Sequence, residues 1–316
     1  MDPAIEKRQA RRPGVRGIPP RSTVPMQTAE SDLDSILKTK GCATRPGSSL
    51  LLGISRMQLM KAMAEPTMDD PEGELFVADS IRELSDCGIP FLLAGTFAVS
   101  AYTGISRRTK DLDIFCKAGD AQRILAHFKA AGYSVTVEDD RWLGKVHRGE
   151  KFFDVIFASA NGTMPVGADW FDRARQIRMC GCDVPIVGPT DLVWSKCFIQ
   201  LRHRYDGADV VHLILKTHDQ IDWHQLLDHM EVHWEVLLVH LLNFRWIYPS
   251  ERDVIPAWLL DELLDRFAAQ RQLPSPATRI CRGRMFSRVD FEIDVREWGF
   301  ADVVGDDPGR NSSRLR

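Results

Sequence analysis

The chain has 316 residues, a net charge of −3 and a pI of about 6.3. This length has room for two domains, and the charge balance excludes a strong overall attraction to nucleic acid. Every apolar run is shorter than the roughly 20 residues needed to cross a membrane. The nearest candidate, 49–63, also contains Arg56 and Lys61. We therefore expect a cytoplasmic protein without a membrane partner.

The cysteines and histidines do not follow a pattern typical of zinc sites. The seven cysteines include no Cys-x-x-Cys pair, and Cys180 and Cys182 are too close together for a zinc knuckle. This pattern indicates free thiols in a reducing compartment. His229 and His233 have the spacing at which two helical histidines share a zinc ion. The motif is not HExxH and no third ligand is evident, so the sequence does not favour zinc.

The amino-terminal part has the composition of a disordered chain. Residues 1–48 are rich in Arg, Pro, Ser and Gly and show no lasting hydrophobic periodicity. We expect a disordered extension over 1–70. Met57 and the methionines after it leave open a later start of translation, in which case 1–56 would not belong to the natural protein.

Residues 71–188 predict an α+β core, a mixed sheet backed by helices. Hydrophobic spacing predicts a first helix over 72–87, and apolar alternation predicts strands after it. The buried side of that helix is expected to carry Leu75, Val77, Ile81 and Leu84. The other expected helices are 97–102 and 120–131, and the expected strands are 91–94, 133–137, 142–147, 151–158 and 182–187.

From residue 189 onward the pattern is helical. We expect Thr190 to cap a helix whose inner side includes Leu201. Together with three later helices this segment would form a helical domain over 189–272. The later helices are expected over 207–215, 230–247 and 255–270. The tail, 273–316, would hold one short strand-like segment over 288–295.

Three aspartates on two predicted strands point to metal-assisted chemistry. Asp111 and Asp113 alternate on one strand and therefore share a face. Like charges side by side on a sheet are destabilising unless a cation offsets them, and Mg²⁺ prefers carboxylate oxygens together with substrate phosphates. Asp154 interrupts a strand that is otherwise apolar, where a lone carboxylate is costly. A solvated strand end is the alternative for the first two alone.

Gly95 and Thr96 lie where a strand gives way to a helix. Glycine lets the backbone come close to a phosphate, and the N–H groups of a helix start attract anions. The Thr96 hydroxyl would cap the helix or touch a phosphate, and both interpretations stay open. Arg107 and Arg108 would stabilise phosphate charge, or one of them would pair with an aspartate.

Two lysines also allow two interpretations each. Lys145 lies on the first arm of a predicted hairpin, and we interpret it as a surface lysine in preference to an active-site group. Lys196 lies mid-helix among apolar neighbours, where the usual outcome is that the ammonium group reaches out to solvent. Asp206, ten residues later, can be read from the sequence alone as the cap of the next helix.

The combination of these residues resembles the nucleotidyltransferase superfamily, the fold of polymerase-beta-like enzymes. The usual pattern is a helix-opening Gly-Gly or Gly-Ser, then Asp-x-Asp, then an aspartate on a later strand. The form Gly-Thr…Gly…Arg-x-Thr-x-Asp-Leu-Asp-Ile is most similar to the branch with abortive-infection toxin nucleotidyltransferases and related uncharacterised bacterial proteins. The resemblance covers residues 75–215 and departs from the usual pattern at Thr96.

The resemblance implies roles for individual residues. The implied catalytic residues, which also hold Mg²⁺ or Mn²⁺, are Asp111, Asp113 and Asp154. The implied nucleotide-binding residues are Gly95, Thr96, Arg107, Thr109, Lys196 and Asp209. In this branch an acidic residue orients the lysine, and Asp209 is the better candidate for that role than Asp206.

The expected function is metal-dependent transfer of a nucleoside monophosphate from a nucleoside triphosphate to a hydroxyl acceptor. The resemblance to the toxin branch implies a transfer-RNA end as acceptor and a cognate antitoxin protein as partner. A small or proteinaceous acceptor stays open, and so does a non-catalytic module that binds nucleotide or a partner protein. An RNA acceptor would require a local basic patch, formed by Arg202, Arg204, Arg245, Arg279, Arg282, Arg284 and Arg288. Alternatively these arginines pair with Asp206, Asp253 and Asp290.

Overall fold

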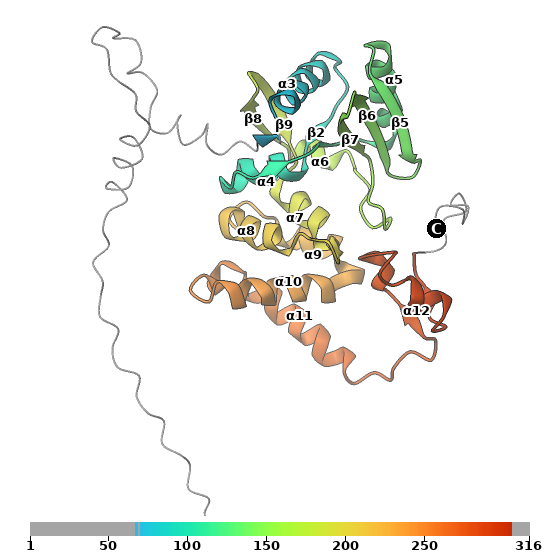
Figure 1. The fold of residues 1–316 in the computed structure, drawn as a ribbon. Coiled ribbons are helices and arrows are strands. Elements are labelled where there is room, and N and C mark those ends of the chain that lie inside the picture. Colours follow the sequence, from blue (N-terminus) through green and yellow to red (C-terminus); the bar gives the residue numbers. More distant parts are fainter. Residues whose placement is uncertain (1–66, 69, 305–316) are drawn as a thin grey trace, which may run out of the picture. The chain divides into compact units, whose positions relative to one another are not determined.

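The computed structural model describes residues 67–68 and 70–304 (Figure 1). The predicted extension over 1–70 therefore lies almost wholly outside the described residues, as does the end of the predicted tail. The strands are β1 (Thr67–Met68), β2 (Leu92–Leu93), β3 (Arg108–Thr109), β4 (Leu112–Phe115), β5 (Ser134–Asp139), β6 (Leu143–Arg148), β7 (Lys151–Ile156), β8 (Arg175–Met179), β9 (Cys182–Ile186), β10 (Gln200–Leu201), β11 (Arg204–Tyr205), β12 (Ile280–Cys281) and β13 (Ala301–Asp302). The helices are α3 (Pro71–Asp86), α4 (Gly95–Thr103), α5 (Ala118–Ala130), α6 (Asp169–Asp172), α7 (Pro189–Cys197), α8 (Gly207–Thr217), α9 (Trp223–His229), α10 (Trp234–Ile247), α11 (Ala257–Gln270) and α12 (Glu292–Arg296), with short 3₁₀ turns η1 (Glu231–His233), η2 (Arg252–Val254) and η3 (Gly283–Met285).

A seven-stranded sheet organises the first part of the described chain, with the strand order β5-β6-β7-β4-β2-β9-β8. Strand β4 runs parallel to β7, and β2 runs parallel to β9. The other neighbouring strands are antiparallel, including the β6–β7 hairpin that the sequence predicted. The sheet is therefore mixed, and the predicted α+β fold class is confirmed.

Helices α3 and α5 cover one face of the sheet (Figure 1). Ile114 of β4 belongs to the apolar cluster on this face, whereas the next residue, Phe115, belongs to the cluster on the other face. This alternation is the one expected of a strand with two covered faces. In α3 the predicted burial of Leu75 is wrong, because Leu75 is 63% exposed and Phe76 is buried in its place.

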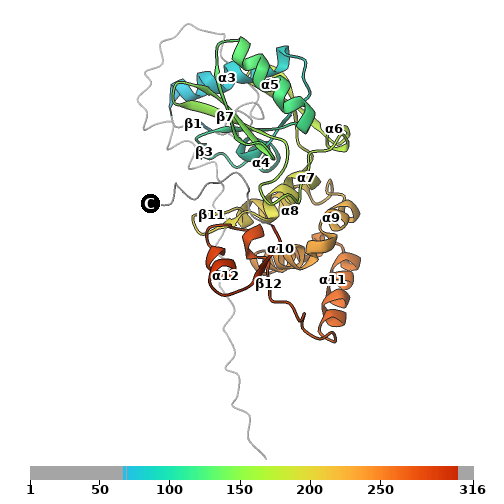
Figure 2. The same cartoon turned by 90° about the vertical axis from the view of Figure 1, so that its right-hand side faces the viewer.

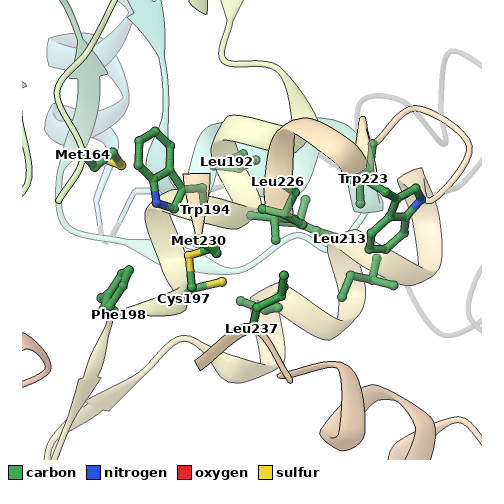
Figure 3. Packing of buried hydrophobic residues seen from close by; sticks show 14 of the residues in the cluster. Met164, Leu192, Trp194, Cys197, Phe198, Leu213, Trp223, Leu226, Met230 and Leu237 are labelled. Carbon is green, nitrogen blue, oxygen red and sulfur yellow. The ribbon is translucent and has the colours of Figure 1, made fainter. Parts of the chain in front are cut away.

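The second apolar cluster joins the sheet to the helical part of the chain. Figure 2 shows α7 and α8 between the sheet and α10, and one buried cluster continues through all of them. Figure 3 shows side chains of this cluster, among them Leu192 of α7, Leu213 of α8 and Leu237 of α10. The sheet and α7 are therefore held in a fixed relation, which matters because both carry candidate site residues. The predicted domain boundaries at 188 and 272 stay predictions.

Several local predictions were wrong. The N-cap of α7 is Gly188, and Thr190 does not cap the helix, because its Oγ1 accepts a hydrogen bond from the Asp222 N–H at 2.9 Å. Leu201 lies on β10 and not on the inner side of α7. The segment 288–295 contains the start of α12 where a strand was expected, and β8 and α9 were not predicted.

Candidate active site

The sheet brings the three predicted aspartates together. Asp113 on β4 lies directly opposite Asp154 on β7, and Asp111 immediately precedes β4. One carboxylate oxygen from each residue lies within 4.8 Å of the other two, and all three side chains are partly buried. The alternation predicted for Asp111 and Asp113 therefore holds, and a solvated strand end does not describe them.

Gly95 starts helix α4 directly against this cluster. Its φ of +55° is in the left-handed region that favours glycine. A Cβ on Gly95 would lie 1.8 Å from Oδ2 of Asp113, so no larger residue fits without moving that carboxylate. The backbone of the preceding residue is also tied to the strand, because the Ala94 N–H donates to the Asp113 carbonyl at 2.9 Å. The start of α4 and the carboxylates therefore form one unit.

The electrostatics of the cluster suit a cation. The pKa of Asp113 is raised from 3.8 to about 7, first because burial disfavours the charged form and second because Asp111 and Asp154 repel it. A divalent ion would relieve this repulsion. Ligands of one octahedral Mg²⁺ ion are at most about 4 Å apart, and these oxygens all lie within 4.8 Å of one another. The residues therefore fit a divalent metal ion by donor type and by spacing.

Lys145 lies beside the aspartates, and the interpretation as a surface lysine was wrong. Its Nζ is 2.5 Å from Oδ1 of Asp154, and only 20% of its side chain is exposed. The pKa of Asp154 is raised, because burial outweighs the stabilising effect of the ammonium group. The sequence predicted the hairpin that carries Lys145, but not the register that sets it opposite Asp154.

Lys196 does not reach out to solvent, contrary to the interpretation from sequence. Its side chain is 4% exposed, and its Nζ lies 2.7 Å from Asp206 and 2.8 Å from Asp209. Asp206 occupies the N-cap position of α8, but its side chain makes no capping hydrogen bond. Asp209 is a partner of Lys196 as predicted, and Asp206 is a second one.

Two arginines also belong to this ion-pair network, which they join through Asp206 and Asp209. Arg107 binds Asp209 through two hydrogen bonds of 2.7 Å each, and Arg204 lies 3.2 Å from Asp206. Burial alone would raise the pKa of Asp206 and of Asp209. Lys196 and the two arginines outweigh that effect, so both pKa values lie below the usual value. Arg107 is thus the arginine that pairs with an aspartate, and its predicted contact with phosphate stays a prediction.

The sequence offered Arg204 as part of a basic patch for RNA or as a partner of an aspartate such as Asp206, and the structure shows the pairing with Asp206. The positive charge of Arg204 lowers the pKa of Asp113, so it lies within electrostatic reach of the three aspartates. The signal in the sequence was its position two residues before Asp206, which on an extended segment sets both side chains on one side. Thr109 is nearly buried and donates a hydrogen bond to the Asp111 carbonyl at 3.1 Å. Thr96 is partly exposed at the start of α4.

Two of the histidines that the sequence analysis considered for zinc are in contact with aromatic rings. The His229 ring stacks on Trp194 at 3.9 Å between ring centroids, and the His233 ring contacts the edge of Phe198. Within residues 70–304 the only cluster suited to a metal ion is that of the three aspartates. A zinc site at these histidines is therefore not supported.

A mixed sheet with a glycine-started helix against three convergent aspartates is the arrangement of the nucleotidyltransferase class. A comparison with protein families matches residues 80–244 to a family described as uncharacterised nucleotidyltransferase. The match covers more than half of the 316 residues, and the chain belongs to this family. The resemblance to the superfamily is thereby confirmed, and the chain is a nucleotidyltransferase enzyme.

The chain also has distant similarity to solved structures. An antigenic nucleotidyltransferase-like protein from Paracoccidioides brasiliensis is 14% identical over 60% of this chain and 94% of that one, with a TM-score of 0.41. A lincosamide antibiotic adenylyltransferase with bound lincomycin is 16% identical over 46% of this chain and 96% of that one, with a TM-score of 0.31. An antibiotic-resistance factor in complex with adenylyl-2″-tobramycin is 15% identical over 64% of this chain and 99% of that one, with a TM-score of 0.33. The family match, and not these distant structures, carries the assignment.

No curated protein sequence matched the chain. Among the helices of the described residues, none is both long enough and apolar enough to span a membrane.

Proposed function

We propose that this enzyme transfers a nucleoside monophosphate from a nucleoside triphosphate to a hydroxyl group, with Mg²⁺ or Mn²⁺ held by Asp111, Asp113 and Asp154. The observation that carries the proposal is the convergence of these three carboxylates within 4.8 Å against the start of α4. When bound, the metal would neutralise phosphate charge and favour loss of the proton from the attacking oxygen.

The proposed transfer forms one bond to phosphorus and breaks another. The acceptor oxygen forms a bond to the α-phosphorus, the bond from that phosphorus to the bridging oxygen breaks, and pyrophosphate leaves with the electron pair. The acceptor hydroxyl loses its proton. Asp154 is the carboxylate that we assign to the acceptor side, because its strand β7 lies nearer to the edge strand β5 than β4 does. Its raised pKa suits a group that accepts a proton.

We assign triphosphate binding to the start of α4 and to the ion-pair network. Gly95 and Thr96 would offer backbone N–H groups, and a hydroxyl, to the phosphates. Arg107, Lys196 and Arg204 carry three positive charges against the two negative charges of Asp206 and Asp209, which leaves one net positive charge. Lys196 is buried, so we expect it to hold the network in place while the two arginines face the phosphates.

The proposal also concerns which kind of molecule carries the acceptor hydroxyl. An RNA end, as in the toxin branch that the sequence resembles, is one candidate. Four of the seven arginines expected to form a basic patch are in ion pairs: Arg202 with Asp290, Arg204 with Asp206, Arg282 with Glu235 and Arg284 with Asp302. This pairing favours a small or proteinaceous acceptor over RNA. The antitoxin partner stays a prediction.

Release of pyrophosphate tests the proposal. The wild-type chain and the Asp111→Asn variant would be incubated with each nucleoside triphosphate, Mg²⁺ and a cell extract as the source of acceptor. We expect pyrophosphate release that depends on Mg²⁺ and on Asp111. Equal release by both proteins, or none from any nucleotide with or without extract, would contradict the proposed function. Nuclease treatment of the extract distinguishes an RNA acceptor from the others.

A further inference from the structure

Lys145 continues the row of charged residues across the sheet. Strands β6, β7 and β4 are neighbours, and the register sets Lys145 opposite Asp154 and Asp154 opposite Asp113. Residues directly opposite each other point to the same face, about 4.7–4.9 Å apart between strands. Asp154 therefore lies between a positive charge on one side and the Asp111–Asp113 pair on the other.

Two contacts fix the position of the Lys145 ammonium group. Its Nζ lies 2.5 Å from Oδ1 of Asp154 and 4.2 Å from the centre of the Phe152 ring. Phe152 precedes Asp154 by two residues on β7, so its ring lies on the same face of the sheet. The side chains of Lys145 and Asp154 are 20% and 15% exposed, so solvent screens this pair only in part.

We propose that Lys145 is a positioning residue for the reaction. It holds Oδ1 of Asp154 and leaves Oδ2 for the metal and the acceptor side. Lys145 itself contacts neither. This inference rests on the proposed function, because it assumes that Asp154 acts in nucleotidyl transfer. Hydrogen-bonded partners that orient metal ligands commonly contribute about 10–100-fold to metal affinity or activity.

A positioning role and a simple charge-balancing role predict opposite effects on metal binding. If Lys145 only offsets negative charge, its removal leaves a more negative cluster, and a divalent cation binds more tightly. If it orients Asp154, its removal lets that carboxylate rotate away, and the cation binds more weakly. The direction of the change therefore distinguishes the two roles.

The experiment is a titration with Mn²⁺ alone, followed by electron paramagnetic resonance, on the full chain without nucleotide. We expect Lys145→Met to weaken Mn²⁺ binding by about 10–100-fold and Lys145→Arg, which keeps the charge and the reach, to restore most of it. Lys151→Met is the matched control, because Lys151 lies on the same hairpin but pairs with Asp70. It should bind Mn²⁺ as the wild type does.

Steady-state kinetics give a second readout. Lys145→Met should lower kcat and leave KM for the nucleotide nearly unchanged, since the proposed triphosphate contacts are on α4 and in the ion-pair network. If Lys145→Met does not fold, Lys145→Gln gives the same test, because it removes the ammonium group and keeps a polar side chain.

Unchanged or tighter Mn²⁺ binding by Lys145→Met or Lys145→Gln would overturn the inference. The proposed function is tested separately in the same titration with Asp113→Asn. If Asp113→Asn binds Mn²⁺ as tightly as the wild type, the proposed function fails and the inference fails with it. If Asp113→Asn loses binding and Lys145→Met does not, only the inference fails.

Discussion

Gly95 and Asp113 are in such close contact that a single methyl group between them would reach 1.8 Å from a carboxylate oxygen. The two residues lie on different elements, α4 and β4, and the backbone hydrogen bond from Ala94 to Asp113 ties those elements together. The start of the helix, which we assign to the triphosphate, and the carboxylate, which we assign to the metal, are therefore positioned by one another.

The first prediction concerns this contact. Gly95→Ala should reduce transfer by about 100-fold, since a displacement of about 1 Å in a reacting group has effects of that size. Gly104→Ala is the control, because Gly104 also has a positive φ, +73°, but open space around its Cβ position. Gly104→Ala should lower the free energy of unfolding by about 1 kcal/mol, because of backbone strain, and should leave the activity intact. Activity assays and urea unfolding of both variants check this. Equal activity losses would show that strain, and not the contact with Asp113, matters.

The second prediction concerns Asp113 itself. Asp113→Asn should lower transfer at least about 100-fold, because a bound metal supplies several kcal/mol of transition-state stabilisation. The same change should stabilise the metal-free fold by about 0.2–1 kcal/mol, the range for relief of like charges opposed on neighbouring strands. Transfer assays and urea unfolding in EDTA measure the two effects. An unfolded variant would mean that the carboxylate is structural.

The third prediction concerns pH. The folded pKa of Asp113, about 7, is raised from 3.8, so the folded state holds this proton more tightly than the unfolded chain does. Its contribution to stability is therefore complete below the unfolded pKa and is lost as the pH rises through the folded pKa. In EDTA, the stability of Asp113→Asn relative to the wild type should grow between pH 5 and pH 8. A difference that stays constant over this range would contradict the raised pKa.

The fourth prediction concerns the buried lysine. Lys196→Met leaves Asp206 and Asp209 without their shared partner, and loss of one member of a buried pair typically costs about 3–5 kcal/mol. Arg82→Met is the comparison, because Arg82 and its partner Asp79 are exposed and such surface pairs contribute only about 0–1 kcal/mol. Urea unfolding of both variants tests this. Similar losses would mean that Lys196 is a minor contributor to the network.

The aspartate cluster could be predicted from the sequence because the patterns that indicate it each lie within one strand. Alternation sets Asp111 and Asp113 on one face, and a carboxylate inside the apolar run around Asp154 needs a partner. The mixed sheet followed from strand and helix spacing in the same way. Such patterns depend only on the residues within one element.

The partners of the two lysines could not be predicted from the sequence, because they depend on which elements pair with each other. Lys145 faces Asp154 only because of the register of the β6–β7 hairpin, and general tendencies of lysine favoured solvent for both Lys145 and Lys196. The segment 288–295 was misassigned for a similar reason. Its apparent alternation gives way to a turn in which the Ser287 hydroxyl donates to Asp290 and accepts from the Asp290 N–H, and Arg202 also holds Asp290.

The most direct test of the account is covalent transfer of label from nucleoside triphosphates radiolabelled at the α-phosphorus. The wild-type chain is incubated with each nucleotide and with candidate acceptors, in Mg²⁺ or in EDTA, beside Asp154→Asn. The account predicts labelled acceptor only with wild-type protein and metal. Label transfer that persists in EDTA, or that Asp154→Asn carries out as well as the wild type, would contradict it.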